Sequence, residues 1–335
     1  SMVRRALSVC TLLLQPALSF SLNRASALPT ATFIRSFTSH RHNKRRMRIE
    51  RDGTSNTITF HPTDGTHSGT VVLMHGLGDS GDGLADLAEM WAKKLPHVKF
   101  ILPTAEQRPV TLNGGMRMNA WYDIVGLDDR ASESCDGIEA SVDRIKTILH
   151  NEKSLGLPYS RMMLAGFSQG GAMSLFTGLQ LQLEIEGEAD KPSLAGILVM
   201  SGYLPGASKF KLSEGFQHVP VVHLHGEADP VVRPQWARMT EQGLKSHGMT
   251  DYTLKFFSGV GHTISMDMVA DAMNFIQKSL PEDSAFVIKP KPPSEMSIKE
   301  LKQAVRNLGL AHQAAGFYEK QEFVKLLEEY QANTL

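Results

Sequence analysis

From residue 57 onward, short apolar runs rich in β-branched residues alternate with longer segments of helical periodicity. Several of these runs are apolar throughout, as strands buried on both faces of a sheet must be. The alternation predicts an α/β fold with a mostly parallel central sheet flanked by helices. The expected strands are 70–74, 99–102, 161–166, 195–201, 219–225 and 252–257, and the expected helices lie near 82–94, 133–152, 169–184, 234–246 and 266–279.

The 335-residue chain is long enough for one large domain with additional segments. The alternating pattern occupies residues 55–280, which we expect to form that domain. A long loop containing several Pro and Gly residues separates the strand that ends at Leu102 from the helix that starts near Glu133. Because loops of this length inside a compact domain are usually functional, we expect this loop to contribute to a site.

The composition changes after Leu280. Residues 281–296 contain four prolines and are interpreted as a linker. Residues 297–331 then show two amphipathic helical patterns, the first beginning at the capping box Ser297-x-x-Glu300. This small helical hairpin is too short to be stable alone, so it is expected to dock on its own domain or on a protein partner.

The hairpin distantly resembles a SAP-type helical pair, which in some proteins grips nucleic acid. Eight acidic and seven basic residues follow Pro281, so the basic face needed for that role is absent. Nine of the 35 Lys and Arg residues of the chain lie in residues 1–49, which contain no acid, so the remainder is acidic. Nucleic acid is therefore not an expected partner.

Residues 1–48 are rich in Arg and Ser and end in a basic run. This composition predicts a targeting segment that is cleaved or disordered, with an organellar destination, mitochondrion or plastid. A signal peptide and a cytoplasmic location are the alternatives. The two cysteines, Cys10 and Cys135, allow no disulfide framework, and no segment is long and apolar enough to predict a transmembrane helix.

The strongest chemical motif is Gly166-Phe167-Ser168-Gln169-Gly170, which follows an apolar expected strand and opens an expected helix. In a strand-to-helix turn, small flanking residues let the backbone adopt a strained conformation that lifts the Ser oxygen clear of the sheet. The alternative is an ordinary Gly-rich turn. The context favours Ser168 as a nucleophile.

A nucleophilic serine needs a base to take its proton and a carboxylate to orient that base. Asp229 follows the expected strand 219–225, and His262 follows the expected strand 252–257 after Gly259-Val260-Gly261. Each residue alone has an ordinary structural interpretation, as a turn-capping Asp or a surface His. In the order Ser168, Asp229, His262 they form a predicted catalytic triad.

The oxyanion of a tetrahedral intermediate requires hydrogen-bond donors. The turn His75-Gly76-Leu77-Gly78-Asp79 follows the expected strand 70–74 directly. The backbone N–H groups of Leu77 and Gln169 are the expected pair of donors. His75 is expected to brace this turn rather than to act as the base.

With these motifs the chain resembles the acyl-protein thioesterase and carboxylesterase family, also called the lysophospholipase family, of α/β hydrolases. The matching segments run in family order across residues 68–280. They are His75-Gly76-Leu77-Gly78-Asp79, Pro103-Thr104-Ala105, residues 108–115, Ala120-Trp121-Tyr122-Asp123, Gly166-Phe167-Ser168-Gln169-Gly170-Gly171-Ala172, Ser201-Gly202-Tyr203-Leu204-Pro205, His225-Gly226, residues 229–232 and Gly261-His262.

The resemblance implies an α/β-hydrolase fold and a serine hydrolase, without cofactor or metal, that cleaves acyl thioesters or carboxylic esters through an acyl-enzyme. The substrate would be a small ester, a lysophospholipid or an S-acylated protein, as for a depalmitoylase. The acyl chain would lie in an apolar channel near the loop after Leu102. The candidates for its wall are Leu77, Leu112, Met116, Trp121 and Leu204, and simple core packing is the alternative for each.

Residues 184–192, the N-terminal segment and the C-terminal hairpin fall outside the family core. A homodimer and a protein partner for the hairpin are left open. Two other functions are considered: a metal-dependent hydrolase, with His223, His225, Asp229 and His262 as ligands, and a non-catalytic α/β-hydrolase acting as a binding module. Alternation along a strand puts His223 and His225 on one face, but a metal site would leave the Ser168 turn and the oxyanion turn without a role.

Overall fold

The computed structural model describes residues 47–62, 66–126, 134–182, 193–289 and 291–334. Residues 47–335 form one compact unit. Residues 1–46 of the predicted targeting segment, which include Cys10, and all of residues 184–192 lie outside the described residues. In the described part, no helix is long and apolar enough to cross a membrane.

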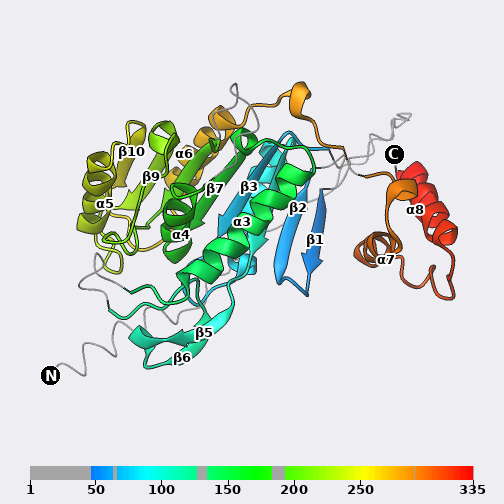
Figure 1. Cartoon of the computed structure of the whole chain (residues 1–335), viewed down its shortest axis with the longest axis horizontal. Coiled ribbons are helices and arrows are strands. Elements are labelled where there is room, and N and C mark those ends of the chain that lie inside the picture. Colours follow the sequence, from blue (N-terminus) through cyan, green and yellow to red (C-terminus); the bar gives the residue numbers. More distant parts are fainter. Residues whose placement is uncertain (1–46, 63–65, 127–133, 183–192, 290, 335) are drawn as a thin grey trace, which may run out of the picture. The chain divides into compact units, whose positions relative to one another are not determined.

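The core of the structure is an eight-stranded sheet in the order β1-β2-β4-β3-β7-β8-β9-β10 (Figure 1). The strands β3, β4 and β7 to β10 run parallel, whereas β1 and β2 are antiparallel additions at one edge. The mostly parallel sheet expected from the alternating pattern is therefore confirmed. Its strands are β1 Arg48–Asp52, β2 Thr57–His61, β3 Gly69–Met74, β4 Val98–Pro103, β7 Met162–Phe167, β8 Gly196–Met200, β9 Val221–Gly226 and β10 Tyr252–Phe257.

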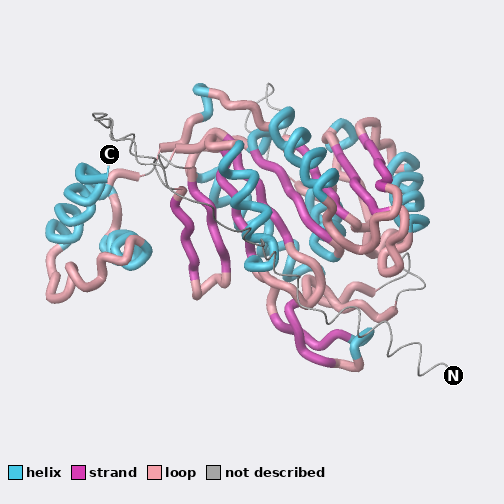
Figure 2. The backbone as a smooth tube through the Cα atoms, turned by 180° about the vertical axis from the view of Figure 1, so that it is seen from behind, coloured by secondary structure: helices cyan, strands magenta, loops and turns pink. Residues whose placement is uncertain are grey.

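Helices cover both faces of the sheet, which explains why the central strands are apolar throughout. In β3, Val72 and Met74 pack with α3, α4 and α5 on one face, while Val71 and Leu73 pack with α2 and α6 on the other. Figure 1 shows α3 and α4 in front of the strands, and Figure 2 shows the opposite face. The helices are α2 Ala85–Lys94, α3 Ile138–Ser154, α4 Gln169–Gly178, α5 Pro234–Ser246 and α6 Met266–Ser279.

The two strands β1 and β2 are not predicted by the sequence pattern. β1 alternates half-buried with exposed side chains, and charged residues occupy most of its positions. An edge strand of this kind lacks the apolar run that identifies the central strands. Its pairing with β2 extends the sheet to Arg48, ahead of residue 55, where the predicted domain begins.

The long loop after Leu102 also contains regular structure. β5 Gln107–Val110 and β6 Met116–Asn119 form an antiparallel hairpin, which Figure 2 shows outside the large sheet. The connection 111–115 includes Gly114 and Gly115 in left-handed conformations, which glycine adopts without steric cost. The segment after Leu102, which we expected to be a loop, therefore contains a short β-hairpin.

The first part of the predicted linker is fixed to the domain. Ile288 forms a backbone bridge with His67, and Arg161 donates hydrogen bonds to the carbonyls of Ser68 and Pro281. The Arg161 guanidinium also lies over the Phe286 ring, 5.8 Å from its centre. Residues 281–288 therefore continue the domain in an ordered path, which corrects the linker interpretation for this half.

The C-terminal hairpin consists of α7 Ile298–Asn307 and α8 Lys320–Thr334. The capping box predicted from Ser297 and Glu300 is present, because each side chain accepts a hydrogen bond from the other residue's backbone N–H. Apolar side chains of both helices form a separate small core, which includes Leu301, Phe323 and Leu327. The two helices therefore stabilise each other along the faces that the amphipathic pattern predicts.

Candidate active site

Ser168 stands between the end of β7 and the first residue of α4, as its motif predicts. Its backbone has φ +55° and ψ −120°, a conformation that side-chain-bearing residues rarely adopt. The flanking glycines are sterically required. A Cβ on Gly166 would lie 2.2 Å from the Gly170 carbonyl carbon, and one on Gly170 would lie 2.1 Å from the Met74 carbonyl oxygen. The motif therefore builds a strained turn at the carboxyl edge of the sheet.

The structure brings Ser168, His262 and Asp229 together in one line of hydrogen bonds. The Ser168 Oγ lies 2.9 Å from His262 Nε2, and His262 Nδ1 lies 2.7 Å from Asp229 Oδ2. Ser168 and His262 are half-buried, whereas Asp229 is only 3% exposed. Both distances are those of direct hydrogen bonds. The arrangement allows His262 to take the Ser168 proton while the carboxylate orients the ring.

The Asp229 carboxylate is fixed by its own turn. Its Oδ1 accepts hydrogen bonds from the N–H groups of Val231 and Val232, both at 2.9 Å. The preceding residue, Ala228, donates its N–H to the carbonyl of Val260, in the loop that carries His262. Two of these N–H groups hold Asp229 Oδ1 within its turn, and the third joins the turn to the loop that carries His262. Oδ2 therefore remains available to His262.

His75 braces the oxyanion turn, as expected. Its Nδ1 donates to the Gly76 carbonyl at 2.7 Å, and its Nε2 accepts from the Ala105 N–H at 2.9 Å. Burial lowers the pKa of His75 to about 4, although the hydrogen bond to Gly76 acts in the opposite direction. A buried neutral ring with both nitrogens occupied has no free lone pair with which to act as a base.

The turn after β3 lies directly against the nucleophile. A Cβ on Gly76 would be 3.3 Å from the Ser168 Cβ. The Gly78 N–H donates to the Asn119 carbonyl, and the Asn119 side chain donates to the Asp79 carbonyl. Gln169 begins α4, where the first N–H groups of a helix have no partner within the helix. The turn that contains Leu77 is therefore held beside Ser168, and Gln169 is the first residue of the helix that follows Ser168.

Gln169 and Trp121 tie the two turns together. The Gln169 side chain accepts from the Trp121 N–H at 2.9 Å and donates to the Tyr122 carbonyl at 2.8 Å. The Trp121 indole donates to the His75 carbonyl at 2.9 Å, and the residue is fully buried. Trp121 thus braces the site from within the core, a role that its position in the motif does not reveal.

The other residues predicted for the channel wall lie in different environments. Leu77 and Leu112 are half-buried and pack against the same core cluster. Met116 lies on the β5–β6 hairpin with 52% of its surface exposed, so it does not form part of an enclosed wall. Leu204 is 5% exposed, and its N–H donates to the Thr240 hydroxyl. Leu77 and Leu112 remain the better candidates for contact with an acyl chain.

The metal-site hypothesis is not supported by the donor geometry. His223 and His225 do share one face, with His223 Nε2 3.1 Å from His225 Nδ1. However, the second nitrogen of each ring also has a hydrogen-bond partner, the Tyr252 hydroxyl and the Val232 carbonyl respectively. Within the described residues, no group of three or more His, Cys, Asp or Glu residues could hold a metal ion.

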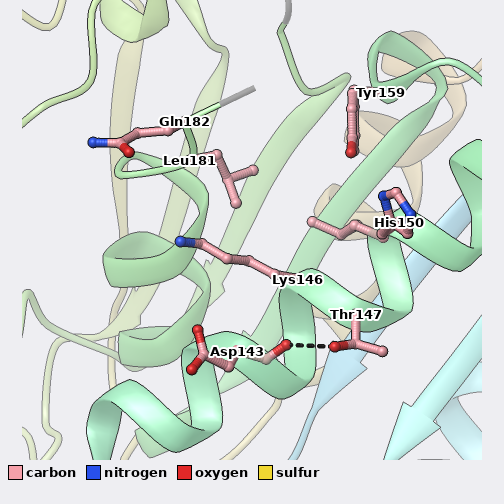
Figure 3. A pocket seen from close by; sticks show the side chains of 8 residues that line it. Asp143, Lys146, Thr147, His150, Tyr159, Leu181 and Gln182 are labelled. Atoms are coloured by element: carbon pink, nitrogen blue, oxygen red, sulfur yellow. Dashed lines mark hydrogen bonds between the residues drawn. The ribbon is translucent and has the colours of Figure 1, made fainter. Parts of the chain in front are cut away.

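A separate pocket lies beside α3 and is distinct from the triad. It has a volume of about 450 Å³ and is lined mainly by residues of α3 together with Tyr159, Leu181 and Gln182. Figure 3 shows Asp143, Lys146, Thr147 and His150 on one helix, with the polar side chains of Tyr159 and Gln182 coming from other segments. None of the predicted site residues lines it, so we assign it no part in the reaction.

The sequence and the fold are both similar to those of known hydrolases. A family model described as Phospholipase/Carboxylesterase matches residues 57–280. Acyl-protein thioesterase 1 homolog 1 of Dictyostelium discoideum is 39% identical over 221 residues, covering 65% of this chain and 93% of that protein. Acyl-protein thioesterase 1 of Neurospora crassa is 37% identical over 234 residues, covering 66% and 91%. The crystal structure of Zea mays acyl-protein thioesterase 2 matches with a TM-score of 0.57 and 28% identity, covering 67% of this chain and 98% of the maize chain.

Proposed function

The chain belongs to the phospholipase/carboxylesterase family of α/β hydrolases, and on that premise we propose that Ser168, His262 and Asp229 cleave acyl thioesters of S-acylated proteins through an acyl-enzyme. The observation that carries the proposal is the continuous hydrogen-bonded line from Ser168 Oγ through His262 to Asp229 Oδ2. The names of the relatives support the substrate class, because each of those cited is an acyl-protein thioesterase.

In the first half-reaction, Ser168 Oγ attacks the thioester carbonyl carbon while His262 Nε2 takes its proton. The negative charge on the former carbonyl oxygen is stabilised by the N–H groups of Leu77 and Gln169. The intermediate collapses when the C–S bond breaks and His262 returns the proton to the departing sulfur. The acyl group is then bound to Ser168 as an ester.

In the second half-reaction, a water molecule replaces the thiol. His262 takes one proton from the water as its oxygen attacks the acyl carbon, and the same two N–H groups stabilise the second oxyanion. The C–O bond to Ser168 breaks, and His262 returns the proton to Ser168 Oγ. The products are a fatty acid and a free enzyme, so no cofactor is consumed.

Rates on matched substrates test the substrate class. We expect an S-acyl cysteine peptide to be hydrolysed faster than the corresponding O-acyl serine peptide and than a lysophospholipid of the same chain length. Ser168→Ala should lower all three activities by several orders of magnitude. A lysophospholipid that is the best substrate would make the chain a lysophospholipase with the same triad. Activity of Ser168→Ala at the wild-type rate would refute the triad itself.

We also propose that residues 1–48 direct import into an organelle, because that segment is rich in Arg and free of acid. A fluorescent reporter fused to residues 2–50 should enter mitochondria or plastids. A diffuse cytosolic signal would contradict this proposal without affecting the triad.

A further inference from the structure

Behind Asp229, three buried rings form a hydrogen-bonded chain that the reaction described above does not use. His223 and His225 lie on β9 and are fully buried, and Tyr252 begins the adjacent strand β10. The Tyr252 hydroxyl lies 2.6 Å from His223 Nδ1, and His223 Nε2 lies 3.1 Å from His225 Nδ1. The last ring nitrogen, His225 Nε2, lies 2.7 Å from the Val232 carbonyl oxygen.

The Val232 carbonyl at the end of the chain fixes the direction of the hydrogen bonds that join the three rings. A carbonyl only accepts, so His225 Nε2 carries the proton. Burial lowers the pKa of both histidines, so each ring is neutral and carries one N–H. His225 Nδ1 must therefore accept from His223 Nε2, and His223 Nδ1 must accept from the Tyr252 hydroxyl. His223 also has a hydrogen bond with the backbone of Gly202, which acts against the effect of burial on its pKa.

The chain ends on the residue that holds the triad carboxylate. Val232 donates its N–H to Asp229 Oδ1, while its carbonyl accepts from His225. His225 Nε2 is also 3.7 Å from Asp229 Oδ2, which is too far for a hydrogen bond but close enough to limit movement of the carboxylate. The turn 229–232 is thus held on one side by its own N–H groups and on the other by the His225 ring.

Resting on the proposed function, we propose that His225, oriented by His223 and Tyr252, is a positioning residue that holds Asp229 in line with His262. A neutral His225 suits this role, because it fixes the turn without adding a positive charge that would compete with the His262 imidazolium for the carboxylate. A buried network in which every group is paired specifies one geometry, because any rotation leaves a polar atom without a partner.

The proposal is tested with His225→Phe and its conservative counterpart His225→Gln. Phe retains the ring but cannot donate to Val232, whereas the Gln amide can donate to that carbonyl and accept from His223. We expect His225→Phe to lower kcat for an aryl ester by about 10- to 100-fold with little change in KM, because misplacement on the order of 1 Å has such effects. His225→Gln should restore kcat to within about 5-fold of wild type, and Tyr252→Phe should lower it by a smaller factor than His225→Phe.

A matched control separates positioning from loss of stability. His67 is a buried histidine paired with Glu152 at the other end of the sheet, so His67→Phe should lower Tm without lowering kcat at temperatures well below Tm. In His225→Phe, a loosened Asp229 stabilises the His262 imidazolium less, so the acid limb of the kcat profile should shift to lower pH. His67→Phe should leave that limb unchanged.

The positioning role of His225 and the role of the triad can be refuted separately. If His225→Phe has the kcat and the pH profile of wild type, the positioning role is wrong while the triad stands. If His225→Phe does not fold, Tyr252→Phe and His225→Gln decide, and kcat equal to wild type in Tyr252→Phe together with loss of kcat in His225→Gln would contradict the chain as described. If Ser168→Ala retains wild-type activity, the proposed function fails, whatever the His225 variants do.

Discussion

The large sheet has one buried polar cluster at the amino ends of its parallel strands, which we call the amino edge, and another at their carboxyl ends, the carboxyl edge. Only the cluster at the carboxyl edge ends at a half-buried nucleophile. At the amino edge, Glu152 accepts hydrogen bonds from Lys99, His67 and Thr70, and all four side chains are buried. At the carboxyl edge, Asp229 is also buried, but the line it begins ends at the half-buried Ser168 Oγ.

The cluster at the amino edge stabilises the fold, whereas the cluster at the carboxyl edge is able to react. In the Glu152 cluster, burial raises the pKa of the carboxyl, but hydrogen bonds from His67 and Lys99 and the charge of Lys99 outweigh it and lower the pKa to about 2. Both Glu152 oxygens are occupied within the protein, so the cluster has nothing to offer a substrate. The triad has the same kinds of group, but its outer end remains able to react. A buried carboxylate therefore indicates a catalytic function only when its hydrogen bonds lead to a reactive group that a substrate can reach.

The largest effect is expected at the reacting atom. Ser168→Ala should reduce turnover by a factor on the order of 10⁴ to 10⁶, because the nucleophile is removed and only the oxyanion donors remain. Its free energy of unfolding should stay close to that of wild type. Steady-state hydrolysis of an aryl ester and urea unfolding of the same preparation measure both quantities. A large loss of stability would mean that Ser168 supports the fold rather than the reaction.

Removing the charge of Asp229 should have the next largest effect. Asp229→Asn is expected to lower turnover by about 10³ to 10⁴, because a neutral amide favours the wrong His262 tautomer, as in the serine protease for which this effect is known. Asp123→Asn provides the control, since Asp123 holds the Thr111 N–H and hydroxyl in the loop and not His262. Equal losses in the two variants would show that Asp229 has no special role in turnover.

The amino-edge cluster should respond in the opposite way. Glu152→Gln leaves the Lys99 ammonium buried without a counter-charge, so we expect a loss of about 3 to 5 kcal/mol in the free energy of unfolding. Turnover of the folded enzyme should remain at the wild-type value. Chemical denaturation and kcat at a temperature well below Tm test the two statements. A reduced kcat with unchanged stability would place Glu152 in the catalytic machinery.

The pH dependence of stability should show the same carboxyl. Its pKa in the folded protein lies below the ordinary value of 4.5, so the stabilising contribution is present above that value and is lost as the pH falls toward about 2. The difference in unfolding free energy between wild type and Glu152→Gln should therefore shrink between about pH 5 and about pH 3. A difference that stays constant over this range would mean that Glu152 is not ionised in the folded state.

The smallest effect concerns the acyl chain. If Leu112 packs against it, Leu112→Asp should slow hydrolysis of long acyl esters more than that of acetyl esters, by up to about 0.8 kcal/mol for each methylene that is no longer buried. Met116→Asp is the matched control, because Met116 is exposed on the same hairpin region and should affect the two substrates equally. Equal reductions in rate for Leu112→Asp on both substrates would move the chain-binding surface elsewhere.

The sequence predicts those parts of the site whose structure is determined by residues close together in the chain. The Gly-Phe-Ser-Gln-Gly turn, the strand ends before Asp229 and His262, and the helices α5 and α6 follow from patterns within a few residues. β1 could not be predicted because it is a charged edge strand that is identified only by its pairing with β2. The Tyr252, His223 and His225 chain depends on the parallel register of β9 and β10, so no local motif indicates it. The exposure of Met116 could not be predicted, because an apolar side chain in a loop does not reveal which way it faces.

Covalent labelling shows directly whether Ser168 is an activated nucleophile. A fluorophosphonate probe reacts with a serine only when a neighbouring base activates it, so wild-type protein should take up one equivalent, on the tryptic peptide that contains Ser168. Ser168→Ala should take up none, and His262→Ala should react more slowly by orders of magnitude. Labelling on a different residue, or undiminished labelling in Ser168→Ala, would show that Ser168 is not the nucleophile. An unreactive wild-type enzyme would favour a non-catalytic binding module.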